Sequence, residues 1–400
     1  MPLSLTANQQ LDLSVLDSIG LAGAEISAYD PSSKNFYVTS GSGLQIVSAA
    51  NPGDLVAGAV IDFSSEAFGA FGNGITSVAV ANGLVAVAVA NAAKSEAGRV
   101  FLLDANGTLL KSVTVGALPD MLTFTPDGKK ILVANEGERD GANGELDAPG
   151  GVSIINLAGG SAQATVTTLD FTAFDGREAA LRAAGVRIFD GKSASIDLEP
   201  EYIAVAASGK EAIVTLQEAN AVALLDLTTQ KFTKIVPLGL KKYQGLLTDF
   251  SDRDGGYVPL SDKPVFGMYM PDAVTAFTSK GRTFYAMANE GDDRDDFMAG
   301  GEKARLSTLT LDPVKFPDAA ALKANAVLGR LNTPNPAAVG KGISGDTDGD
   351  GDIDQILSYG ARSFSIVDSR GKQEFDSGDH IERFIASQGT DVFDDSRSDD

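Results

Sequence analysis

Three segments of the chain repeat one pattern, and this repetition restricts the fold more than any other feature. Each begins with Pro followed by Asp or Glu, continues as a strand, a turn with Gly or Lys and a second apolar strand, and ends at an acidic residue. The segments are 118–137, 199–218 and 270–290. A third strand is expected after each, at 151–156, 221–226 and 305–310. Looser copies begin at Ala24 and Gly74, and a strand at 363–368 is expected to close a sixth, partial unit.

Units of three or four strands that recur at about 45–50 residues are typical of β-propellers. A β-sandwich would not begin three units in the same way. The sequence therefore predicts an all-β fold, a β-propeller that forms one domain over 1–400. Insertions are expected at about 171–191, 241–265 and 313–345, with short helices at 177–184 and 318–325.

The segment 346–354 carries the most explicit metal-binding pattern in the chain. Acidic residues alternate along it, and Gly351 permits the sharp turn that would wrap their oxygens around a hard cation. The ligands expected for calcium are Asp346, Asp348, Asp350, Asp352 (through its backbone carbonyl) and Asp354. Leu357 stands where an EF-hand has Glu, and no helical pattern flanks the loop. The loop instead resembles the calcium loop of FG-GAP propeller repeats, which precedes a strand; a solvated acidic turn is the weaker interpretation.

Charge and composition exclude several classes of function. The net charge is −22 and the isoelectric point is near 4.4, which disfavours nucleic acid or an anionic membrane surface as partner. Cys is absent and His380 is the single histidine, so zinc sites built from Cys or His and thiol nucleophiles are excluded.

Targeting signals are not evident in the sequence. No stretch is apolar enough to predict a membrane span, and the N-terminus lacks the basic and then apolar order of a signal peptide. The export signal was removed, lies elsewhere, or the protein is not exported. Weak modular calcium sites fill at the millimolar calcium found outside cells, so the expected location is extracellular or at the cell surface.

The acidic residues of the repeats are candidates for a ring around the propeller axis. Asp120, Glu201 and Asp272 open equivalent inner strands, and Glu25 could join them. The acids that end the second strands are expected in the neighbouring loops; they are Glu136, Glu218 and Glu290. Two interpretations stay open: the acids fix the register of adjacent blades, or they bind calcium that serves phosphoester hydrolysis.

A second acidic segment, 289–296, contains Arg294 among its carboxylates and has no ladder of ligands spaced by glycine. A solvated loop explains it at least as well as a calcium site.

The repeat motifs together resemble the bacterial choice-of-anchor I family. The similar segments are Leu-Pro-Asp at 118–120, Glu-Pro-Glu-Tyr-Ile-Ala-Val at 199–205, Met-Pro-Asp-Ala at 270–273, Asn-Glu-Gly-Asp at 289–292 and Asp-Ser-Arg-Ser-Asp at 395–399. The resemblance implies a secreted or surface-anchored β-propeller, and some members are described as alkaline-phosphatase-like. In relatives the last segment leads into another blade, so a further segment or another polypeptide is expected to complete a ring of roughly seven blades.

The function expected from these features is that of an extracellular calcium-binding β-propeller. It would serve adhesion, the surface layer or matrix interaction, with a surface or matrix component as partner. The alternative is a calcium-dependent phosphomonoesterase, similar to alkaline phosphatase or phytase, that acts at the acidic axial face. Calcium is the expected cofactor in both cases.

Overall fold

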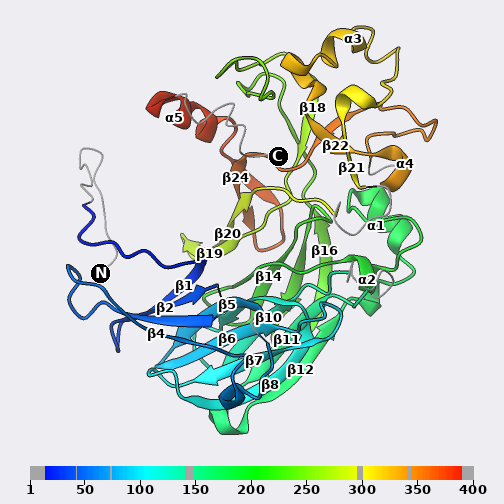
Figure 1. The fold of residues 1–400 in the computed structure, drawn as a ribbon. Coiled ribbons are helices and arrows are strands. Elements are labelled where there is room, and N and C mark those ends of the chain that lie inside the picture. Colours follow the sequence, from blue (N-terminus) through cyan, green and yellow to red (C-terminus); the bar gives the residue numbers. More distant parts are fainter. Residues whose placement is uncertain are drawn as a thin grey trace.

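Five four-stranded antiparallel sheets make up most of the chain (Figure 1). The computed structural model describes residues 14–41, 43–72, 74–139, 147–294, 301–339 and 344–389. The strands of the first three sheets are β1 (Ala24–Asp30), β2 (Asn35–Ser40), β3 (Gly43–Ser48), β4 (Val56–Ile61), β5 (Gly74–Ala81), β6 (Leu84–Ala90), β7 (Ala97–Leu103), β8 (Leu109–Ala117), β9 (Pro119–Phe124), β10 (Lys130–Asn135), β11 (Gly151–Asn156) and β12 (Thr165–Asp170). The strands of the last two are β13 (Ile203–Val205), β14 (Glu211–Leu216), β15 (Ala221–Asp226), β16 (Lys231–Pro237), β19 (Val274–Ser279), β20 (Arg282–Asn289), β24 (Ser363–Asp368) and β25 (Gln373–Asp376).

The sheets pack one against the next as the blades of a propeller do. The first strand of each sheet contacts the first strand of its neighbour, in the order β1, β5, β9, β13 and β19. Each pair of neighbouring sheets shares an apolar core, because alternate side chains of a strand point to opposite faces. Between the first two blades, for example, Tyr37, Val87 and Phe101 are fully buried. The predicted all-β propeller is therefore confirmed, while the blade count of a complete ring and the domain boundaries stay predictions.

The fifth blade departs from the predicted strand order. Its third strand is β24, which pairs with β20 from Asn289 opposite Ser363 to Phe284 opposite Asp368. The prediction of a third strand at 305–310 is wrong, as is the assignment of 363–368 to a sixth unit. Residues 305–310 have a strand-like composition, but Leu306 is buried in the core of the segment inserted between β20 and β24. The pattern of apolar residues along a single strand does not reveal the long insertion between β20 and β24.

The inserted elements form a small unit of their own beside the inner strands (Figure 1). Its strands are β17 (Leu240–Lys242), β18 (Val265–Met268), β21 (Lys303–Arg305), β22 (Asn332–Pro334) and β23 (Ile356–Ser358). β18 pairs with β17 on one side and with β23 in parallel on the other. The connection between the fourth and fifth blades and the segment inserted into the fifth blade therefore meet in one sheet. Their core includes Tyr243, Val265 and Leu328.

Short helices occupy the connections. They are α1 (Glu178–Ala184), α2 (Ala194–Asp197), α3 (Ala319–Leu322), α4 (Pro336–Val339) and α5 (His380–Gln388), with 3₁₀ turns η1 (Glu66–Phe68), η2 (Ser161–Gln163), η3 (Thr172–Phe174) and η5 (Leu306–Thr308) and the π-turn η6 (Asn325–Gly329). Both predicted helices are present, α1 within 177–184 and α3 within 318–325. Within the described ranges, no helix has the length and apolar character needed to cross a membrane. The motif at 395–399 lies outside the described residues.

Candidate functional site: an acidic axial cavity and an acidic loop

Each repeat opens with one residue followed by Pro and then Asp or Glu, called here the x-Pro-acidic motif. This motif forms a tight turn that fixes the position of its carboxylate. Leu118 and Met270, the residues before proline in the first and last copies, both have a left-handed backbone with φ of 42°. Their carbonyls accept hydrogen bonds from the ends of the second strands, Glu136 N to Leu118 O at 2.9 Å and Gly291 N to Met270 O at 3.1 Å. A left-handed conformation is unfavourable for residues other than glycine, so these hydrogen bonds are needed to stabilise it. The turn thus places Asp120 beside the segment that carries Glu136.

Hydroxyl groups join the acidic turns of one blade to the next. Thr215 of the fourth blade donates its Oγ1 hydrogen to the carbonyl of Asp272 in the fifth, at 3.0 Å. Thr76 of the second blade makes the same kind of bond to the carbonyl of Pro119 in the third. These contacts set the inner strands in register, so acidic residues from different blades come together near the axis.

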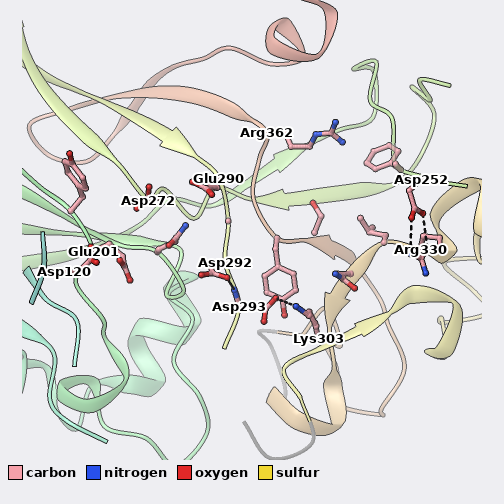
Figure 2. A pocket seen from close by; sticks show the side chains of 18 of the residues that line it. Asp120, Glu201, Asp252, Asp272, Glu290, Asp292, Asp293, Lys303, Arg330 and Arg362 are labelled. Atoms are coloured by element: carbon pink, nitrogen blue, oxygen red, sulfur yellow. Dashed lines mark hydrogen bonds and ion pairs between the residues drawn. The ribbon is translucent and has the colours of Figure 1, made fainter. Parts of the chain in front are cut away.

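The acidic turns line a cavity of about 850 Å³ between the blades and the inserted unit. Its acidic residues from the inner-strand turns and the end of β20 are Glu25, Asp120, Glu201, Asp272 and Glu290. Figure 2 shows Asp120 and Glu201 close together on one side, with Arg362 and the Asp252–Arg330 pair on the other. Arg330 is bound by two hydrogen bonds to Asp252, at 2.9 and 3.0 Å, and Arg362 pairs with Glu382 at 2.9 Å. The cavity therefore has an acidic side and a side where guanidinium groups are already paired.

Three predicted ring residues form a tight cluster at the acidic side. One carboxylate oxygen from each of Asp120, Glu136 and Glu201 lies within 4.8 Å of the other two. Burial and the charges of Asp272 and Glu25 raise the pKa of Asp120 to about 7. Burial and the surrounding carboxylates likewise raise the pKa values of Glu136 and Glu201 well above the usual range. Ionisation of each of these buried groups is therefore unfavourable unless a positive charge lies close to it.

The other predicted ring residues lie around this cluster. Glu218 is 6% exposed, and burial raises its pKa to about 7. Burial and the charge of Asp292 raise the pKa of Asp272. Glu290 and Glu25 line the cavity with exposed side chains. The structure therefore brings the acids of the three repeats to one place, as their equivalence in the sequence predicts, and their chemical role stays a prediction.

Arg294 is buried, whereas the sequence left a solvated loop as one interpretation of its segment. It is not solvated: only 2% of it is exposed, and its guanidinium lies 4.8 Å from the centre of the Phe189 ring. Its Nε donates to Glu199 Oε2 at 2.6 Å, and its backbone N donates to Glu302 Oε2 at 2.5 Å. Burial acts to lower the pKa of Arg294, but the carboxylates of Glu199 and Asp197 raise it above the usual range.

A second arginine completes this buried network. Arg187 pairs with Glu302 and donates to the carbonyl of Glu218 at 2.7 Å. Burial acts to raise the pKa of Glu302, yet the guanidinium groups of Arg187 and Arg294 lower it below its ordinary value. No signal in the sequence marks Arg187 or Glu302, because their partners lie far away along the chain. Through Arg187, the network links Glu302 of the inserted segment to the backbone of Glu218 beside the acidic cluster.

The acidic loop at 346–354 folds back on itself through hydrogen bonds between its own carboxylates and backbone amides. Asp346 accepts hydrogen bonds from Gly349 N at 2.6 Å and Gly351 N at 3.0 Å, and both glycines have positive φ, 86° and 97°. Asp354 accepts one from Thr347 N at 2.7 Å. The loop is followed by the strand β23, as predicted.

Two groups of carboxylates in this loop have the spacing of cation ligands. Oxygens of Asp346, Asp348 and Asp354 lie within 4.8 Å of one another, and so do those of Asp312, Asp352 and Asp354. Asp350 belongs to neither group, whereas Asp312, which the sequence did not suggest, completes the second. Lys315 Nζ lies 2.8 Å from Asp354 Oδ1, and this hydrogen bond lowers the pKa of Asp354. The residues present fit calcium, since its ligands are oxygens held by a flexible loop.

The family is identified by a sequence match that covers both the blades and the inserted unit. The profile of the choice-of-anchor I domain matches residues 25–400. The chain belongs to the choice-of-anchor I family. As a member, this choice-of-anchor I protein is a surface or secreted β-propeller. Among curated proteins, no sequence matches it significantly.

Solved structures resemble this choice-of-anchor I protein only distantly. The Cps50 (Swd1) β-propeller domain of Myceliophteria thermophila shares 10% identity at a TM-score of 0.40, over 70% of this chain and 65% of that one. A protein from Lactobacillus plantarum shares 14% at 0.42, over 67% and 64%. Hydrazine synthase of Kuenenia stuttgartiensis shares 15% at 0.35, over 66% and 80%. The sheet topology, rather than these likenesses, carries the propeller assignment.

Proposed function

We propose that this protein is a calcium-binding β-propeller that mediates adhesion, surface-layer or matrix contacts outside the cell. The observation that carries the proposal is the loop at 346–354, where Asp346, Asp348 and Asp354 present oxygens at the spacing of one cation. Family membership supports a location where calcium is abundant.

Calcium would stabilise the part of the protein surface that contacts the partner. The loop lies within the inserted unit, directly before β23, and the bridge between Leu311 and Ile353 joins it to an earlier segment of that unit. A cation bound only to the folded state stabilises that state by mass action. Calcium would therefore order the unit that covers the axial cavity, and with it any partner surface that this unit provides.

The test combines stability with binding to a cell surface. Calcium is expected to raise the melting temperature, and a chelator to abolish that gain. Fluorescently labelled protein is expected to bind isolated bacterial envelopes in calcium and to be released by chelator. A melting curve that is the same in calcium and in chelator would remove the calcium assignment, and envelope binding that ignores calcium would remove its proposed role in adhesion.

A second candidate function has a specific observation in its favour. The cavity of about 850 Å³ holds a carboxylate cluster at metal spacing on one side and guanidinium groups on the other. A cation at the cluster would polarise a phosphate oxygen and activate water, while Arg362, which pairs with Glu382, would add positive charge on the other side of the cavity. These features suit a calcium-dependent phosphomonoesterase.

Hydrolysis of p-nitrophenyl phosphate and of phytate, in calcium and in chelator, decides this candidate. Calcium-dependent turnover that is lost in Asp120→Ala and in Asp272→Ala would establish it. Absence of turnover in calcium-loaded, folded protein would eliminate it and leave the binding function.

A further inference from the structure

Four carboxylates meet where the third and fourth blades adjoin. Asp120 opens β9 and Glu136 follows β10 in the third blade, while Glu201 precedes β13 and Glu218 follows β14 in the fourth. Oxygens of the first three lie within 4.8 Å of one another, and the charge of Glu218 acts on both Glu136 and Glu201. The cluster is thus assembled by the packing of two blades and not by one acidic loop.

The carboxylate of Glu218 supplies an independent indication of a ligand site. Glu218 is 6% exposed, and its Oε2 is buried with no hydrogen-bond partner among the described residues. A buried acceptor without a partner loses its hydration and gains nothing in return. Glu201 is nearly as buried, at 8%, and no side-chain hydrogen bond joins it to any described residue.

The nearby arginines do not neutralise the cluster. Arg294 is committed to Glu199 and lies 3.7 Å from Asp197, and Arg187 is committed to Glu302. Two guanidinium groups thus face the three carboxylates of Asp197, Glu199 and Glu302. The charge of Arg294 also acts to lower the pKa of Glu218, yet negative charge remains in excess at the cluster. A buried group of this kind is stabilised by a bound cation.

We propose that Asp120, Glu136 and Glu201, with the buried carboxylate of Glu218 beside them, bind a divalent cation, calcium by the chemistry of the donors, at the junction of the third and fourth blades. Calcium binds oxygens at about 2.3–2.6 Å, so ligands of one ion stand within about 5 Å of each other. Magnesium keeps several waters and is seldom held by an all-carboxylate cage. The site deepens the proposed calcium-dependent function, on which it rests for the identity of the cation, but it uses none of the residues of the acidic loop.

The position of this axial site gives the cation access to ligands. Asp120 and Glu201 line the cavity, whereas Glu136 and Glu218 do not. The protein oxygens therefore approach from the blade side, and the remaining coordination positions of the cation face the cavity. Water or an oxygen of a bound ligand completes the shell there.

Calcium titration by calorimetry, with three variants of the full chain, separates the axial site from the loop. The axial variant is Glu136→Gln/Glu201→Gln, and the loop variant is Asp348→Ala/Asp352→Ala, which removes one carboxylate from each of the two groups in the loop. The matched control is Asp54→Asn/Glu66→Gln, which removes two exposed carboxylates that belong to neither site. The axial variant is expected to lose about one equivalent of calcium that the loop variant keeps, and the control is expected to bind as the wild type does.

The outcomes distinguish the two sites. A loop variant that is folded by circular dichroism and binds no calcium would overturn the axial site. An axial variant that binds no calcium while the loop variant does would overturn the loop site and support the axial one. Because the axial variant could fail to fold, the loop variant alone decides the question: about one equivalent retained supports the axial site, and none contradicts it.

Discussion

Glu136 and Glu201 belong to different blades, yet one oxygen of each lies within 4.8 Å of the other and of Asp120. Glu136 follows a second strand, and Glu201 precedes a first strand. Only the packing of β9 against β13 brings them together. A propeller built from acidic repeats therefore concentrates negative charge at its axis, where a cation can act as a structural or a chemical element.

Replacing Asp348 by alanine should weaken calcium binding at the acidic loop. Asp348 supplies an exposed oxygen of the group it forms with Asp346 and Asp354, so the fold loses no buried contact. Because calcium affinity follows the number of charged ligands, the dissociation constant should rise about tenfold or more. Calorimetric titration measures it. Asp54→Ala, at an exposed carboxylate away from the loop, should leave the affinity unchanged.

Lys315→Met should have the opposite effect on the same loop. The ammonium group lies 2.8 Å from Asp354 Oδ1 and competes with a cation for that oxygen. The pair is partly exposed and hence weak, so calcium affinity should increase about two- to fivefold. Lys234→Met removes an equal charge from an exposed position on β16 and is the control. Lower affinity in Lys315→Met would show that Lys315 positions Asp354 instead of competing.

Arg294→Met should destabilise the protein strongly. The substitution leaves Glu199 and Asp197 buried without their cation, and removing one partner of a buried pair costs about 3–5 kcal/mol. Urea unfolding measures the change in the free energy of unfolding. Arg282→Met, whose side chain is 59% exposed beside Glu374, should cost far less. Equal losses in the two variants would contradict the network.

The ionised carboxylate of Glu302 should make the free energy of unfolding depend on pH. Its pKa is lowered in the folded protein from the ordinary value of 4.5, so the ionised form contributes stability above that value. This contribution is lost as the pH falls through the folded pKa. The difference in unfolding free energy between wild type and Glu302→Gln should therefore shrink as the pH falls from about 6 to about 3. A difference that stays constant with pH would contradict the pairing with Arg187.

The sequence predicted the parts of the fold that repeat. Strands that recur with the same Pro-acidic start identified the propeller, and equivalence of Asp120, Glu201 and Asp272 predicted their convergence. The loop around Asp346 was recognisable because its ligands are close in sequence. Residues such as Arg187, Glu302 and Asp312 were not recognisable, since each acts through partners that only the fold brings near. The third strand of the fifth blade was missed for the same reason.

A crystal structure of the protein grown in calcium tests the central claim, that this propeller binds cations at its axis as well as in its loop. The account predicts anomalous difference density within about 2.3–2.6 Å of oxygens of Asp346, Asp348 and Asp354, and a second peak among Asp120, Glu136, Glu201 and Glu218. Carboxylates at the axis that bond only to one another or to water, with no ion between them in saturating calcium, would contradict it.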